Sequence, residues 1–357
     1  MKKIDIKNFE ECVKAKNEFD GNLRFGAKKF HAETNRSGQG RPSSGYLIRE
    51  HAKVVVDTGA ERYQCISGVW EDVDTCPACS SKDREKFLTR FALDIYRCCD
   101  CTHRYLNPRV KFDEAMKIYA DDKTASDIYT QPLQKEIDRI KYSYGLELIE
   151  QLDPPSIEKI MDIGCGAGVF LEVAFERGWK SCVGVDVNER YADIYADAKG
   201  VQFINSTFEA LDASRLGSGY DCVAMWSVLE HLYDVHNIIR AVKGLLKDGG
   251  LLFILVPNVE SLATRLMREM SPVFAWKHLS HFSPKSLKHL MAIHGFDCVR
   301  FETVITEIDN IKSYMSGEYP YHGHGDPDGL FDFVTPEYIY RHNLGSRMIG
   351  IFKNVKR

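Results

Sequence analysis

The chain of 357 residues lacks several features that would assign it to common protein classes. It has no run of 18 apolar residues, so no transmembrane helix is expected. Residues 1–10 lack the apolar core of a signal peptide, which predicts a cytoplasmic protein without a membrane partner. Neither sign of charge dominates, since the net charge is −4. This balance argues against a nucleic-acid partner.

The composition is that of a globular protein with ample core. Hydrophobic residues make up 44% of the chain and charged residues 27%. The length favours one large domain with a smaller module. In a cytoplasmic protein, the eleven cysteines are expected to be metal ligands or buried thiols rather than disulfides.

A glycine-rich loop after an apolar segment indicates a nucleoside site. Residues 157–163 read as a buried strand, followed by Gly164, Gly166 and Gly168 and then by a helical pattern. The free N–H groups at the start of that helix would face a ligand. Asp186, at the end of the next apolar segment, is placed to accept both hydroxyls of a ribose. An ordinary turn is the alternative for the glycines alone.

The loop departs from the dinucleotide-binding pattern. That pattern requires a glycine at position 169, where this chain has Val169. Asp162, two residues before the first glycine, would repel a pyrophosphate but suits a cationic ligand such as the amino-acid end of S-adenosylmethionine. With Asp162 and Asp186, the loop resembles the class I S-adenosylmethionine-dependent methyltransferases, and the cofactor is therefore predicted to be S-adenosyl-L-methionine.

Alternating strands and helices predict an α/β fold. The fold class is a Rossmann-like, doubly wound, mostly parallel seven-stranded sheet with an N-terminal zinc ribbon. A helix over 233–246 should end at the glycine turn 247–250, and another should begin at Ser283 and end at Gly295. The resemblance implies an antiparallel last strand. The expected strands are 157–163, 182–187, 201–205, 220–226, 251–256, 298–305 and 348–352.

Two Cys-x-x-Cys knuckles predict a metal site. Cys76 and Cys79 are followed, after eighteen residues, by Cys98 and Cys101, the spacing of a four-thiolate structural zinc site. Cys99 is then the spare thiol. The alternatives are unrelated cysteines or a redox pair, and a redox pair needs only one motif at a helix start. The module resembles the zinc ribbon of bacterial methyltransferases in sugar and polysaccharide pathways. Those ribbons usually have glycine where this chain has Thr102.

Candidate catalytic groups follow the fourth and fifth strands. Methyl transfer requires alignment and removal of an acceptor proton, and imidazole titrates near neutral pH. Glu230 and His231 resemble the pair of ubiquinone-type and sugar methyltransferases, in which the histidine faces the methyl group. His281 is the second candidate base or acceptor clamp, and each histidine has a structural role as its alternative. The residues expected to contact the cofactor are Asp162, Gly164, Cys165, Gly166, Gly168, Asp186, Val187, Thr207, Phe208 and Trp226; the resemblance places Thr207 and Phe208 beside the adenine.

These motifs divide the chain into four regions. The expected divisions are an N-terminal extension (1–70), a zinc ribbon (71–110), a helical cover (111–155) and the methyltransferase domain (156–357) with an insertion at 306–346, which either covers the acceptor or caps the sheet edge. The acceptor is expected to be a small molecule, a sugar or nucleotide sugar. A non-carbohydrate small molecule, a protein acceptor, or a cofactor-binding protein without turnover remain the alternatives.

Overall fold

The computed structural model describes most of the chain from residue 52 onward. The described residues are 52–57, 60–65, 70–90, 93–308, 311 and 334–355, apart from gaps at 121, 123–125, 128, 153, 155, 157, 196–199 and 211–215. Most of the N-terminal extension and the centre of the insertion lie outside them. Within the described part of the chain, no helix has the length and apolar character needed to cross a membrane.

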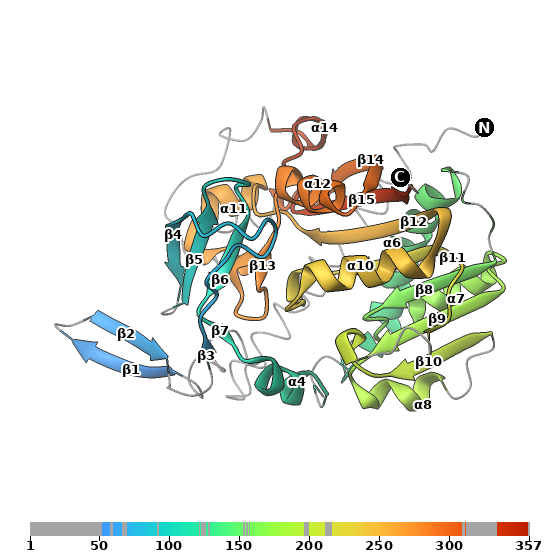
Figure 1. Cartoon of the computed structure of the whole chain (residues 1–357), viewed down its shortest axis with the longest axis horizontal. Coiled ribbons are helices and arrows are strands. Elements are labelled where there is room, and N and C mark those ends of the chain that lie inside the picture. Colours follow the sequence, from blue (N-terminus) through green and yellow to red (C-terminus); the bar gives the residue numbers. More distant parts are fainter. Residues whose placement is uncertain are drawn as a thin grey trace.

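A seven-stranded sheet forms the larger part of the molecule (Figure 1). The strand order is β10-β9-β8-β11-β12-β15-β14. β15 is antiparallel to both β12 and β14, and the other six strands run in one direction. This sheet confirms the predicted α/β fold class. The strands are β8 (Lys159–Ile163), β9 (Ser181–Asp186), β10 (Val201–Asn205), β11 (Tyr220–Trp226), β12 (Leu246–Pro257), β14 (Phe296–Val304) and β15 (Arg347–Asn354).

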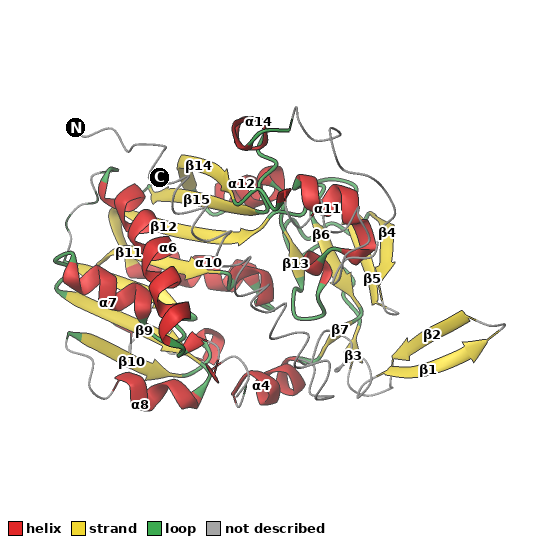
Figure 2. Ribbon diagram, turned by 180° about the vertical axis from the view of Figure 1, so that it is seen from behind, coloured by secondary structure: helices red, strands yellow, loops and turns green. Residues whose placement is uncertain are grey.

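Helices cover both faces of this sheet, with a separate apolar core on each side (Figure 2). One core contains Leu146 of α6 and Phe170 of α7, and the other contains Ile239 of α10 and Leu287 of α12. Apolar side chains on one stripe of each helix therefore face the strands. The helices are α6 (Pro132–Glu150), α7 (Val169–Glu176), α8 (Ala192–Tyr195), α10 (Val235–Leu245) and α12 (Pro284–Ile293).

The helix ends show one confirmed prediction and one error. α12 begins with a capping box in which Ser283 and Ser286 exchange hydrogen bonds, and Gly295 follows the helix with a φ of 70°. In contrast, no glycine turn separates α10 from the next strand. The chain becomes extended at Leu246, directly after the helix, and pairs there with β11. Gly249 lies inside β12, where the register with β11 is irregular.

A four-stranded antiparallel sheet lies beside the large one, with the first cysteine knuckle in the segment before β4 and the second at the turn from β5 to β6. Its order is β13-β6-β5-β4, and β13 comes from the segment between β12 and α12. The ribbon and the methyltransferase region therefore share one sheet, which the sequence did not predict. The strands are β4 (Arg84–Arg90), β5 (Leu93–Cys98), β6 (Arg104–Asn107) and β13 (Ser280–His281).

Short elements complete the described fold. β1 and β2 form a separate hairpin, and β3 pairs with β7 between the ribbon and α4. α4 provides part of the expected helical cover. These elements are β1 (Ala52–Asp57), β2 (Ala60–Cys65), β3 (Trp70–Glu71), β7 (Arg109–Val110), α4 (Phe112–Ala120), α11 (Leu262–Met267) and α14 (Pro336–Arg341).

Candidate functional site

A cavity of about 410 Å³ opens at the carboxyl ends of the parallel strands. This is the edge at which ligands bind in open α/β sheets, and the volume is typical of a small-molecule site. All predicted cofactor-binding residues except Asp162 line it. α4 and α6 close the opposite side with Met116 and Tyr142, so the helical cover lies over the crevice.

The glycine loop needs its glycines for two physical reasons. Gly164 and Gly168 have φ values of 73° and 80°, a region that side chains disfavour. A Cβ on Gly164 would also lie 2.4 Å from Val228, whereas one on Gly166 would meet nothing within 4 Å. Gly168 is the N-cap of α7 and no side chain caps the helix. The first N–H groups of α7 are thus available to a ligand.

Asp186 connects the end of β9 to the glycine loop. Its carboxylate accepts hydrogen bonds from the backbone N–H of Gly166 and of Asn188, each at 2.9 Å. Burial raises its pKa, and these N–H groups oppose the rise. Asp186 lines the cavity, and each of its oxygens can accept a further hydrogen bond, as two ribose hydroxyls would require.

Asp162 lies behind the cavity wall rather than on it. The side chain is 2% exposed, and its Oδ1 has no hydrogen-bond partner among the described residues. Burial raises its pKa well above the usual range, and the charge of Asp186 adds to the rise, while Lys141 opposes it. A buried carboxyl with an unused acceptor favours a donor or a cation nearby.

Aromatic and apolar side chains form the remaining wall. Phe208, in the 3₁₀ turn η2 (Phe208–Ala210), and Thr207 lie on it beside β10. Trp226 packs against Tyr142 and Phe253, with ring centroids 4.7 and 4.4 Å apart. Trp226 therefore lines the cavity and also belongs to the apolar core. The sequence did not predict three cavity residues of α6, namely Asp138, Lys141 and Tyr142. Amphipathic periodicity does not show which polar residues of a helix face a ligand.

His231 lies on the cavity wall in the turn η3 (Leu229–His231), directly after β11. Its Nδ1 is 2.8 Å from the carbonyl oxygen of Lys277 and 3.3 Å from the hydroxyl of Tyr119. Since a carbonyl only accepts, Nδ1 carries the proton and Nε2 keeps a lone pair. Burial lowers the pKa of His231 to about 3, with His278 adding to the effect. The imidazole is thus neutral, rather than titrating near pH 7 as the sequence suggested.

The other two catalytic candidates occupy different positions. Glu230 is 1% exposed, and its Oε1 lies 3.9 Å from Nε2 of His231. Burial raises the pKa of Glu230 to about 8. His281 is 2% exposed in β13, where it pairs with Arg104 of β6, and it does not line the cavity. The structure thus brings Glu230 and His231 together and separates His281 from the crevice.

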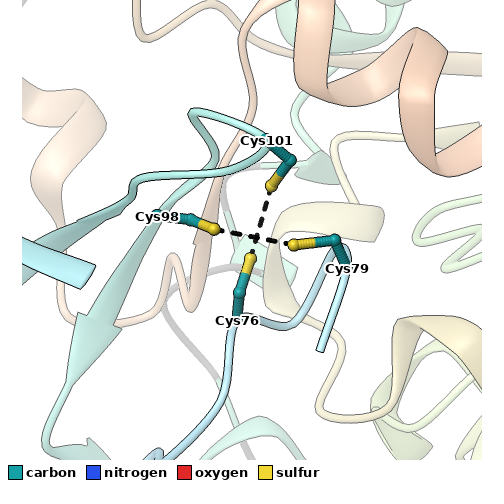
Figure 3. Close-up of side chains that lie close together, drawn as sticks. All are labelled: Cys76, Cys79, Cys98 and Cys101. Atoms are coloured by element: carbon teal, nitrogen blue, oxygen red, sulfur yellow. Dashed lines mark hydrogen bonds between the residues drawn. The ribbon is translucent and has the colours of Figure 1, made fainter. Parts of the chain in front are cut away.

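The four predicted zinc ligands converge on one point (Figure 3). Their sulfur atoms all lie within 4.8 Å of one another, and the pairs Cys76–Cys101 and Cys79–Cys98 are 3.5 Å apart. A tetrahedral ion with Zn–S bonds of about 2.3 Å separates its ligands by slightly less than 4 Å. Cys99 is exposed and outside the cluster. The donor set and its geometry therefore fit a structural zinc ion.

The sheet order, the glycine loop and the acid after the second strand together describe a nucleoside-binding α/β enzyme. The sequence profile of the family described as "Methyltransferase domain" matches residues 96–300. Because this match covers more than half of the chain, the protein belongs to that family, the class I S-adenosylmethionine-dependent methyltransferases.

Three curated relatives are similar to this chain. A ubiquinone biosynthesis O-methyltransferase of Aeromonas salmonicida is 24% identical over 193 residues, which cover 51% of this chain and 78% of the relative. One of Albidiferax ferrireducens is 31% identical over 32% of this chain and 46% of the relative. The C-methyltransferase NovU of Streptomyces niveus is 26% identical over 60% of this chain and 49% of the relative. The chain thus spans about half the length of the last two.

Proposed function

We propose that the protein methylates a small-molecule acceptor, a sugar or nucleotide sugar. The observation that carries the proposal is that the glycine loop, Asp186 and His231 line the same cavity. A carbohydrate acceptor is supported by the likeness of the cysteine module to zinc ribbons of sugar-pathway methyltransferases. The ubiquinone-biosynthesis relatives favour a second candidate, a phenolic acceptor.

Each residue has a proposed role in holding the methyl donor. Asp186 binds the ribose hydroxyls, and Thr207 and Phe208 flank the adenine. Cys165, Val187 and Trp226 supply apolar contacts at the wall, and Asp162 favours the cationic amino-acid end. The donor supplies a methyl group on a positively charged sulfur. Zinc in the ribbon has a structural role, because four thiolates leave no open coordination position.

His231 is proposed to take the acceptor proton. Its Nε2 lone pair is free and its ring is fixed by Lys277 and Tyr119. As the new bond to the acceptor atom forms and the bond from carbon to sulfur breaks, the proton passes to Nε2. Glu230, whose Oε1 lies 3.9 Å from Nε2, stabilises the resulting imidazolium once its own carboxyl, with a pKa raised to about 8, has lost its proton. His281 is retained as the second candidate, and a variant at each histidine separates the two.

The proposal is tested by binding and by turnover. Calorimetry is expected to show binding of S-adenosylmethionine and no binding of NAD, because the third dinucleotide glycine is absent. Incubation with methyl-labelled S-adenosylmethionine and matched panels of nucleotide sugars and phenols should label the sugars. Labelling of phenols alone would establish the second candidate, and NAD binding without sulfonium binding would overturn both.

A further inference from the structure

Three metal-ligating side chains, one of them His231 of the cavity wall, meet away from the ribbon cysteines. One ligand atom each of Glu230, His231 and His278 lies within 4.8 Å of the others. Nε2 of His231 is 3.9 Å from Oε1 of Glu230, and the two imidazole rings are 4.9 Å apart between centroids. An ion about 2.1 Å from each of two such atoms fits between them.

Both imidazoles are oriented as metal-binding histidines are. Nδ1 of His231 is held at 2.8 Å by the carbonyl oxygen of Lys277, and Nδ1 of His278 is held at 2.7 Å by that of Val273. Each carbonyl fixes the proton on Nδ1 and leaves Nε2 with a lone pair. Such a second hydrogen bond is the usual outer partner of a metal-bound histidine.

The surroundings of Glu230 independently indicate that its carboxylate binds a ligand. Its side chain is 1% exposed, and neither carboxylate oxygen has a hydrogen-bond partner among the described residues. An unpaired carboxyl buried in this way is costly. Among the described residues no lysine or arginine lies within ion-pair distance of Glu230, and Arg347 acts on its charge only from farther away. A cation bound by all three groups would remove this cost.

We propose that Glu230, His231 and His278 form a second metal site, for a divalent transition-metal ion such as Zn²⁺. Two imidazoles and a carboxylate are a known donor set for such ions. Since the ion uses the Nε2 lone pair of His231, an occupied site removes the proposed base from proton transfer. Metal binding therefore inhibits methyl transfer, a consequence that rests on the proposed function, whereas the binding itself does not.

The test counts metal ions per chain. Wild-type protein, dialysed to equilibrium against micromolar Zn²⁺, is expected to hold one more ion than the variants Glu230→Gln and His278→Ala. The control His289→Ala removes an exposed imidazole of α12 and should keep the wild-type count. Glu230→Gln has nearly the shape of the native side chain, so retained S-adenosylmethionine binding shows that the variant is folded.

Two results separate this proposal from the proposed function. Equal metal counts in the wild type and both variants would overturn the metal site, whatever the activity. Loss of one equivalent in both variants supports it, even if no tested acceptor is methylated. Where methylation is measured, the wild-type rate should fall in proportion to the fraction of chains that hold the extra ion. A wild-type rate that is unchanged with the second ion bound would show that His231 is not the base.

Discussion

At the scale of single residues, Asp186 has an observed role in the glycine loop and a proposed role as the ribose acceptor. Asp186→Ala removes a charged acceptor for the ribose and also the partner of two loop N–H groups. S-adenosylmethionine binding should weaken by about 1.5–3 kcal/mol, measured by calorimetry. Asp186→Asn keeps one acceptor oxygen and should lose less. Unchanged affinity in Asp186→Ala would place the ribose elsewhere.

His231 gives the second residue-level prediction. His231→Ala should lower kcat by roughly 10²–10⁴-fold with little change in S-adenosylmethionine affinity, because the imidazole acts on the acceptor proton. His281→Ala, away from the cavity, is the comparison variant. If His281→Ala abolishes turnover and His231→Ala does not, the base belongs after β12.

The pH dependence of His231 follows from its surroundings. Its pKa in the folded protein is about 3, so the ring stays neutral as the pH falls from neutrality. Protonation of His231 should therefore cause no loss of kcat/KM between about pH 7 and 5, a range in which an exposed imidazole would titrate. A fall in the kcat/KM of the wild type with a midpoint near pH 6.5 that is absent in His231→Ala would contradict this prediction.

At the scale of elements, a strained residue directly follows the second knuckle. Thr102 has a φ of 65°, which disfavours a β-branched side chain. This explains why similar ribbons have glycine there. Thr102→Gly should raise the free energy of unfolding by about 1 kcal/mol in thermal denaturation. Thr89→Gly, within strand β4, should lower the free energy of unfolding. If both variants are less stable than the wild type, Thr102 is not under strain.

The knuckles also predict which thiols hold zinc. Cys98→Ser should release the ion, whereas Cys99→Ser should retain it, because Cys99 is exposed and outside the cluster. Metal analysis of the two purified variants distinguishes them. Equal retention of zinc by both would contradict the assignment.

The sequence predicted those parts of the fold and site that depend on local patterns. The strand before Gly164, the glycines and Asp186 follow one another closely, so their spacing alone indicated a crevice. The pairing of β6 with β13 joins residues far apart in the chain, and a two-residue strand has no periodicity to read. The depressed pKa of His231 also had no sequence signal, because burial by other elements causes it.

At the scale of the whole molecule, the ribbon is hydrogen-bonded to the segment before α12 and, through it, to the turn η3. β6 pairs with β13, and the N–H of Leu106 donates to the carbonyl of Leu279 at 3.0 Å. Leu279 in turn donates to the carbonyl of Glu230 at 2.8 Å. Removal of zinc by a chelator should therefore speed hydrogen exchange in residues 278–282. Exchange in β8 and β9 is the internal reference and should change less.

The shared sheet also limits how this protein can be divided. A version that begins after residue 110 would leave the backbone of β13 without its partner strand. It would also expose an apolar cluster in which Trp276 and Phe274 pack against Leu93 and Ile95 of the ribbon. Unpaired edges and exposed aromatic patches promote self-association. The region after residue 110 therefore depends on the ribbon for strand pairing and for burial of its aromatic side chains, so the two are expected to fold as one unit.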